Sequence, residues 1–423
     1  MNKIAVIGFG CAAVHGIQGM REGGYTGEIH VFAPVDTPPE NPMLTTYYAS
    51  GRISPEGRYP FGTVAELQEK YGLTLHLNDP VTRFDAEAKT LTTRSGGVFA
   101  WDGALIASGA NPWAPPMEGD GGDECFPMRT MADAQRLKDR LAQGGVKTAL
   151  VVGASMIGIK AVEIFVNAGI SCTLADIAPH IFPLAALDGT AARVETYLRE
   201  KGVELRFNAG AAAIGKRPDG GYTAAFTDGS ALDADLIVLC VGTRTNLPFL
   251  IPGQINVNRG IVVDDHMRAS VPGVYAAGDC CEGNNLQSGQ TQVIGLWERA
   301  GTQGRTAGAN LAGENAVCDG GMVQNITHFF DMDFISVGDK RLSGESVSFT
   351  GQGGRLYIEA VVEAGQIRCV NLLGGHRISG VIRSRLWKTA RGSARGLSPE
   401  EIGLLRREDV PEGFITLLGG SGL

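Results

Sequence analysis

The segment Gly8-Phe9-Gly10-Cys11-Ala12-Ala13 decides how the first part of the chain folds. It fits the pattern G-x-G-x-x-G/A and follows an apolar run at 4–7 that is typical of a buried parallel strand, and a second strand is predicted at 28–32. In such a unit the first glycine permits the tight turn, and the second lets a pyrophosphate touch the backbone. The final alanine lets helix and strand pack closely. The residues therefore predicted to bind a dinucleotide are Gly8, Gly10, Ala12 and Ala13, and a glycine turn without a ligand is the alternative.

A second unit of the same kind begins about 145 residues further along the chain. Its strand is predicted at 148–152, and Gly153-Ala154-Ser155-Met156-Ile157-Gly158 follows, with Ser155 where the middle glycine is usual. Asp176 stands 18 residues beyond Gly158, at the end of the next predicted strand. A carboxylate there accepts hydrogen bonds from ribose hydroxyls and repels a 2′-phosphate, which favours NADH over NADPH; the alternative is a turn aspartate. The residues predicted to bind this second dinucleotide are Gly153, Ser155, Met156, Ile157, Gly158 and Asp176.

A third segment, residues 273–279, favours a flavin. It predicts a short strand that ends in Gly278-Asp279, directly before an expected helix start. The carboxylate of Asp279 would then hydrogen-bond the ribityl hydroxyls of FAD, whereas the alternative is an aspartate that only caps the helix. The two fingerprints and this aspartate together predict FAD and NAD(H) as cofactors.

The composition describes a globular protein and disfavours several classes of partner. The net charge of −8 argues against nucleic acid, because phosphate binding needs a basic surface. No stretch approaches the roughly 18 apolar residues that a membrane helix needs, so no membrane is expected as a partner. The eight cysteines form no CxxC pair, which favours buried thiols in a cytoplasmic protein over a disulfide scaffold. The seven histidines lack metal-ligand spacing, so no metal site is predicted.

Taken in order, these motifs resemble those of the FAD/NAD-linked pyridine nucleotide–disulphide oxidoreductases over residues 1–320. The further matching segments are Ala107-Ser108-Gly109, Met128-Arg129-Thr130, Val241-Gly242-Thr243-Arg244, 259–264 and Ala277-Gly278-Asp279. By this resemblance, the residues added to the expected cofactor sites are Ala107, Ser108, Gly109, Gly242, Gly278 and Asp279.

The resemblance also implies the fold and its division. It implies an α/β fold with two Rossmann-like dinucleotide-binding domains, for FAD and NAD, and a small C-terminal α+β domain. The implied domains are a discontinuous FAD-binding domain at 1–112 and 244–322, an NAD-binding domain at 113–243, and the C-terminal domain at 323–423.

The segment from Leu296 to Gly304 narrows the resemblance to one subgroup. It is similar to the W-x-x-A-x-x-Q-G of rubredoxin reductases, oxygenase-type ferredoxin reductases and the NADH-side half of nitrite reductases. This implies that Trp297 lies beside the isoalloxazine, as a residue that both binds the cofactor and takes part in catalysis. A core tryptophan is the alternative.

Two departures from the family concern the first domain. Phe32-Ala33-Pro34 stands where the family has an acid for the FAD adenosine ribose, so Asp36 or water is expected to take its place. Pro42 and Met43 stand near the position of the redox cysteine in the disulfide-reducing members. Because thiolate chemistry with the flavin needs sulfur at that face, a disulfide substrate is not expected.

The third departure is Lys160, on the helix after the second fingerprint, where the family has a glutamate beside the nicotinamide. In the ferredoxin-reductase branch that glutamate pairs with a lysine from the loop near residue 46, which here is Thr46. Lys160 is therefore predicted to act in catalysis, because a nearby positive charge favours the anionic reduced flavin. A lysine on the helix surface is the alternative.

These observations predict an FAD-dependent oxidoreductase that passes electrons from NADH to a separate acceptor, with a ferredoxin or rubredoxin as first choice. A basic cluster without an acid in its own sequence is expected to dock an acidic electron-transfer protein; it comprises Arg383, Arg385, Lys388, Arg391 and Arg395. A solvated basic face is the alternative, and a homodimer is left open. The rival functions are an NADH oxidase, peroxidase or disulfide reductase that uses Cys280 or Cys281, and a non-enzymatic interaction protein that responds to NADH.

Overall fold

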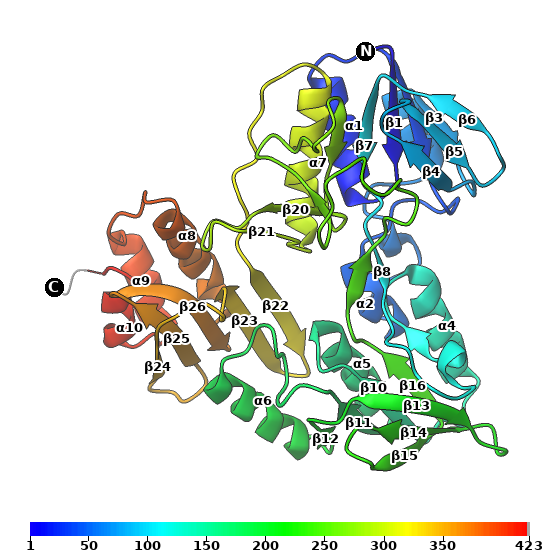
Figure 1. Ribbon diagram of the computed structural model, residues 1–423. Coiled ribbons are helices and arrows are strands. Elements are labelled where there is room, and N and C mark those ends of the chain that lie inside the picture. The colour runs from blue at the N-terminus through cyan, green and yellow to red at the C-terminus, as the bar shows by residue number, and fades with distance from the viewer. Residues whose placement is uncertain (421–423) are drawn as a thin grey trace.

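The computed structural model describes residues 1–420, and its first part is built on a five-stranded parallel sheet (Figure 1). The sheet has the order β19-β7-β1-β2-β3, and every neighbouring pair is parallel. Its strands are β1 (Lys3–Ile7), β2 (Glu28–Phe32), β3 (Leu73–His76), β7 (Gly103–Ile106) and β19 (Val274–Ala276). Because β19 comes from the second half of the chain, this domain is assembled from two distant segments.

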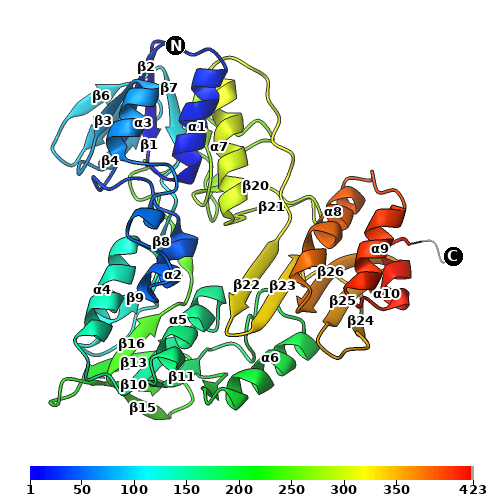
Figure 2. The same cartoon turned by 180° about the vertical axis from the view of Figure 1, so that it is seen from behind.

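Two helices that lie far apart in sequence pack tightly on this sheet. Figures 1 and 2 show α1 (Cys11–Glu22) and α7 (Trp297–Leu311) side by side. Glycines let the backbones touch: a Cβ on Gly304 would collide with the carbonyl oxygen of Ala12, and a Cβ on Gly308 with that of Gly16. The helix of the first fingerprint is therefore held by the helix that opens with the tryptophan motif.

A second parallel sheet lies in the middle of the chain, with the order β12-β11-β10-β16-β9. Its strands are β9 (Phe126–Pro127), β10 (Thr148–Val152), β11 (Ser171–Ala175), β12 (Glu204–Arg206) and β16 (Leu236–Leu239). The helices α4 (Met131–Ala142) and α5 (Met156–Asn167) pack against it, and an antiparallel sheet flanks it, made of β13 (Ala211–Lys216), β14 (Tyr222–Phe226) and β15 (Ala231–Ala234).

Two paired strands join the parallel sheets. The strand β8 (Ala110–Pro112) is antiparallel to β17 (Thr243–Thr245), so the chain leaves the first domain and returns to it at the same place. The boundaries expected at residues 112 and 243 fall on these strands, and the division into domains remains a proposal.

The C-terminal part is an antiparallel sheet between two layers of helix. Its strands are β22 (Gln324–Phe329), β23 (Met332–Gly338), β24 (Glu345–Thr350), β25 (Tyr357–Glu363) and β26 (Gln366–Leu373). One face of the sheet is covered by α8 (Ser379–Ala390), α9 (Pro399–Arg407) and α10 (Glu412–Leu417). The other face packs against α6 (Asp188–Glu200). Glu359 accepts hydrogen bonds from the backbone N–H groups of Gly189 and Thr190, so a carboxylate from this sheet caps the N-terminus of α6.

The helix that was expected directly after Asp279 is not present. No helix begins after Asp279; the strand β20 (Cys281–Asn284) follows instead, because Gly278 turns the chain at a φ of 83° and Cys281 pairs with Ile261. Among residues 1–420, no helix is both long enough and apolar enough to cross a membrane.

Candidate functional site

The first fingerprint forms an open cradle at the carboxyl edge of the first sheet. Gly8 has a φ of 104°, and a Cβ there would collide with the carbonyl oxygen of Ala107 on the neighbouring strand end. A Cβ on Gly10 or Gly109 would meet nothing within 4 Å, so packing alone does not require glycine at these positions. Gly10 precedes α1 and gives it no side-chain cap, which leaves the first N–H groups of the helix for a phosphate. This geometry fits the pyrophosphate of a dinucleotide.

The Gly278-Asp279 turn lies at the same edge, because β19 and β1 are both parallel to β7. The N–H of Gly278 donates to Oε1 of Gln303 on α7, at 2.9 Å. Asp279 accepts from Nη2 of Arg129 at 2.7 Å, so a residue of the middle segment contacts the first domain here. Since no helix begins after Asp279, its alternative role as a helix cap is excluded.

The end of β2 carries an aromatic pair where the family has an acid. The ring of Phe32 stacks on that of His76, with centroids 4.4 Å apart and planes 6° apart. Asp36, the expected substitute, is exposed on the loop beyond the strand. The strand end therefore carries a buried ring where a carboxylate was expected.

In the second fingerprint, Ser155 replaces the usual glycine because its side chain caps the helix that follows. Ser155 is the N-cap of α5: its Oγ accepts from the N–H of Gly158 at 3.2 Å and donates to the carbonyl oxygen of Cys240 at 3.0 Å. Met156 and Ile157 form the first turn of the helix. A Cβ on Gly158 would collide with the carbonyl oxygen of Gly153, so both outer glycines are fixed by packing.

Asp176 lies beside this loop, at the end of β11. Its two carboxylate oxygens accept from the N–H of Ala154 at 2.6 Å and from the N–H of Ala178 at 2.8 Å. A carboxylate has about four acceptor positions, so about two remain for ribose hydroxyls. Gly242, at the end of the neighbouring strand β16, has a φ of 107° and open space at its Cβ position.

Trp297 opens α7 at the boundary with the first fingerprint. Its carbonyl oxygen accepts from the thiol of Cys11 at 3.5 Å, and its ring stacks on Phe61 with centroids 5.6 Å apart. The side chain is half-buried, in contrast to the fully enclosed tryptophan of a core. Its place beside a flavin remains a prediction.

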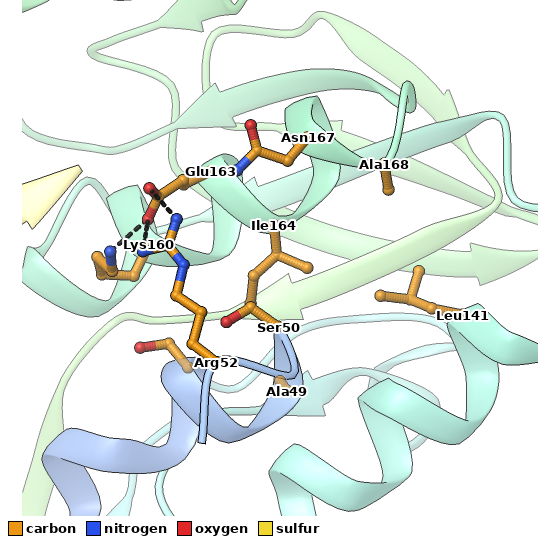
Figure 3. A pocket seen from close by; sticks show the side chains of 10 residues that line it. Ala49, Ser50, Arg52, Leu141, Lys160, Glu163, Ile164, Asn167 and Ala168 are labelled. Carbon is orange, nitrogen blue, oxygen red and sulfur yellow. Dashed lines mark hydrogen bonds and ion pairs between the residues drawn. The ribbon is translucent and has the colours of Figure 1, made fainter. Parts of the chain in front are cut away.

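Lys160 is buried, and the surface-lysine alternative is wrong. Lys160 and Glu163 are 5% and 2% exposed and form an ion pair one helical turn apart (Figure 3). The Lys160 ammonium also donates to the carbonyl oxygen of His328 at 2.7 Å and lies 5.0 Å from the ring centre of Tyr47. Thr46, at the position of the family's lysine, is buried and lines the same cavity as Lys160.

Glu163 and Arg52 are residues of this site that the sequence did not reveal. The guanidinium Nη2 of Arg52 donates to Glu163 at 2.7 Å, and the N–H of Phe330 donates to it at 2.9 Å. Burial raises the pKa of Glu163, but the hydrogen bonds from Lys160 and Arg52 outweigh burial, so the pKa is lowered from 4.5 and the carboxylate is charged. The family's glutamate–cation pair thus has a counterpart one turn further along α5, with the cations supplied by Lys160 and Arg52.

All eight cysteines are buried. Burial raises the pKa of both Cys280 and Cys281, so neither is a ready thiolate. Met43, at the position of the family's redox cysteine, is exposed and carries no thiol. Among the described residues, no group of three or more His, Cys, Asp or Glu side chains is arranged to hold a metal ion.

The basic cluster on and after α8 is partly neutralised by acids from other elements, contrary to the expectation from its own sequence. Arg383 pairs with Glu298, next to Trp297, at 2.5 Å, and Arg391 pairs with Asp319 at 2.5 Å. The remaining cations, Arg385, Lys388 and Arg395, line a cavity of about 190 Å³ together with Glu401.

Comparison with known proteins agrees with this geometry. The sequence model of the pyridine nucleotide-disulphide oxidoreductase family matches residues 2–304. A rubredoxin-NAD(+) reductase of Ectopseudomonas oleovorans is 27% identical over 318 residues, which are 73% of this chain and 80% of the relative.

Two solved structures share the fold. One is a covalent putidaredoxin reductase–putidaredoxin complex (TM-score 0.83, 20% identity, 91% of this chain and 93% of that chain). The other is a water-forming NADH oxidase of Lactobacillus brevis bound to NADH (TM-score 0.85, 22% identity, 93% and 91%). At these levels of sequence identity, the two structures show only that the fold is shared.

These findings confirm the predicted α/β fold with its Rossmann-like dinucleotide-binding domains. They also confirm an oxidoreductase that acts on NADH, with FAD and NAD(H) as its cofactors. The family model covers well over half of the sequence, including both fingerprints. The chain therefore belongs to the pyridine nucleotide-disulphide oxidoreductase family.

Proposed function

We propose that this protein takes hydride from NADH onto FAD and passes the electrons to a small acidic redox protein. The observation that carries the proposal is the pair of fingerprint loops at the carboxyl edges of two parallel sheets, with no accessible thiol among the eight cysteines. Bound FAD supplies the chemistry, because its isoalloxazine accepts a hydride and can release electrons one at a time. Without an accessible thiol, the electrons must leave to a partner molecule.

The chain's own residues divide the binding work between the two loops. Gly8, Gly10 and the Ala107-Ser108-Gly109 turn would cradle the FAD pyrophosphate, and Asp279 would accept from the ribityl hydroxyls. Ser155 and Gly158 shape the loop for the NADH pyrophosphate. Trp297 would cover one face of the flavin, and Lys160 would contribute its charge near the nicotinamide.

The surface around α8 supports an acidic acceptor. The pair between Arg383 and Glu298 fixes α8 against the N-terminus of α7, directly beside Trp297. Lys388 and Arg395 are exposed on the same patch and have no ion-pair partner among the described residues. An acidic protein that docks on these cations would therefore approach the tryptophan end of the flavin site.

The proposal also includes a location in the cytoplasm and assembly as a homodimer. The burial of the cysteines and the absence of a CxxC pair support a reducing compartment. The homodimer rests on the family resemblance alone.

Charge reversal on α8 tests the acceptor. We expect the double variant Lys388→Glu/Arg395→Glu to raise the KM for an acidic [2Fe–2S] ferredoxin roughly 10-fold at low salt, because rim charges steer association. The effect should shrink as salt is added. NADH-dependent dye reduction should stay unchanged, because neither residue lies in a fingerprint loop.

The matched control is Lys70→Glu/Lys147→Glu, which changes the net charge equally on other, exposed parts of the surface. An equal rise of KM in the control would overturn the docking site. Turnover with oxygen that no ferredoxin accelerates would favour the NADH oxidase instead.

The choice of nucleotide tests Asp176. We expect the parent to reduce its flavin with a kcat/KM at least roughly 10-fold higher for NADH than for NADPH, since one carboxylate–phosphate repulsion is worth a factor of this order. Asp176→Asn should narrow this ratio several-fold while keeping the residue's shape. Asp228→Asn, on an exposed turn of the same segment, should leave the ratio unchanged. Equal rates with both nucleotides in the parent would refute the role of Asp176.

A further inference from the structure

A cavity of about 270 Å³ is lined by Lys160 and by nine residues that the function proposed above does not use (Figure 3). It opens between α2 (Thr45–Ala49), the last turns of α5 and the end of α4. Apart from Lys160, none of the residues predicted to bind FAD or NADH lines it. It is therefore distinct from the two fingerprint loops.

One end of the cavity carries an excess positive charge. Glu163 accepts from Lys160, from Arg52 and from the N–H of Phe330, so a single buried carboxylate faces two cations. The ammonium group of Lys160 donates hydrogen bonds to Glu163 and to the carbonyl oxygen of His328, and it also lies over the ring of Tyr47. The three charged side chains sum to one uncompensated positive charge.

Arg52 holds that excess charge within reach of a ligand. Its guanidinium has five N–H donors, and only two of its nitrogens donate to Glu163. Its side chain is 40% exposed, whereas that of Glu163 is 3% exposed. The free donors of Arg52 are therefore the polar groups of this cavity that are most available to an incoming anion.

The other end of the cavity is mainly apolar, with the uncharged amide of Asn167 beside it, and it disfavours charge. Leu141, Ile164 and Ala168 form its wall, and Figure 3 shows the three side chains on the side away from Lys160. Ile164 and Ala168 belong to the C-terminal end of α5, where the helix dipole is negative and repels anions. An anionic group is thus favoured only at the Arg52 end.

We propose that this cavity binds a small monocarboxylic acid, with its carboxylate on Arg52 and its apolar body between Leu141, Ile164 and Ala168. The size fits, since an apolar cavity of about 150 Å³ already holds benzene. A single excess charge matches a monocarboxylate, and a phosphate dianion would leave a charge uncompensated beside the negative helix end. The planar fork of a guanidinium also suits a carboxylate.

Calorimetric titration of the full-length, FAD-loaded protein tests the site with benzoate as the probe. We expect benzoate to bind at least roughly 10-fold more tightly than benzyl alcohol, because a charge-assisted hydrogen bond contributes about this factor. Inorganic phosphate should bind more weakly than benzoate. The readout is binding itself, so a failure here leaves the electron-transfer proposal untouched, and failure of that proposal leaves this one untouched.

Two variants and one matched control test whether benzoate binds in this cavity. Arg52→Met should weaken benzoate roughly 10- to 100-fold and leave benzyl alcohol unchanged. Ala168→Phe should fill the apolar end and weaken both probes, without touching the charges, so it decides the matter even if Arg52→Met folds poorly. Arg58→Met removes an arginine from the same loop that does not line the cavity, and it should change nothing. Absence of benzoate binding in the parent, unchanged binding in Ala168→Phe, or tighter binding of phosphate than of benzoate would each overturn the proposal.

Discussion

The Gly304→Ala variant is expected to be less stable than the parent by roughly 3 kcal/mol and to lose FAD during gel filtration. The new methyl group would overlap the carbonyl oxygen of Ala12, which belongs to the backbone and cannot rotate away. The α1 and α7 helices would have to separate, and the first fingerprint would move with α1. Urea unfolding and the ratio of flavin to protein absorbance measure the two effects.

The control for this variant is Gly380→Ala, a glycine of α8 with nothing within 4 Å of its Cβ position. Alanine there should be neutral or stabilise by roughly 0.5–1 kcal/mol, because it lowers the entropy of the unfolded chain and favours the helix. If Gly304→Ala kept the stability and the flavin content of the parent, the close helix contact would not support the FAD site.

The Glu163→Ala variant is expected to lose roughly 3–5 kcal/mol of stability at neutral pH, because it leaves the buried ammonium of Lys160 without a counter-charge. The double variant Lys160→Met/Glu163→Leu should lose clearly less stability than Glu163→Ala, since it removes both members of the buried pair and costs mainly the hydrogen bonds of Phe330 N–H and Arg52 to Glu163. Chemical unfolding of the three proteins gives the comparison.

Acid provides a second measure of the same pair. The pKa of Glu163 is lowered in the folded state, so its ion pairs stabilise the protein above about pH 4.5 and are lost as the pH falls through the lowered value. Between pH 7 and pH 3 the parent should therefore lose more stability than the double variant does. Equal losses, or a Glu163→Ala variant as stable as the parent, would mean that the pair contributes little.

The parts of the site that sequence could predict are local in the chain. Each fingerprint is a run of six residues, and its turn, helix start and close packing follow from those residues alone. Arg52 was missed because its contact with Glu163 joins α5 to a loop more than a hundred residues away. Glu163 stands three residues after Lys160 on the same helix, so this i, i+3 pair could have been predicted from the charge pattern of α5, and Glu163 largely neutralises the lysine. Its effect on a nearby flavin is therefore smaller than a single unpaired ammonium would give.

Two other differences between the sequence-based expectations and the structure also result from long-range contacts. The helix expected after Asp279 is replaced by β20, because Cys281 finds a pairing partner in Ile261. The basic cluster of α8 was free of acids in its own sequence, yet Glu298 and Asp319 reach two of its arginines from other elements. Patterns within one segment do not contain such partners.

The late strand β19 and the late helix α7 also set the order in which the nascent chain can fold. The middle segment is continuous in sequence, so its parallel sheet can close as soon as residue 239 has been synthesised. The first sheet gains its edge strand β19 only with residues 274–276, and until α7 has been made the face of α1 that packs against α7 has no partner, although α1 can already contact β7. During synthesis the N-terminal strands are therefore the segment most exposed to aggregation and to chaperones, although they leave the ribosome first.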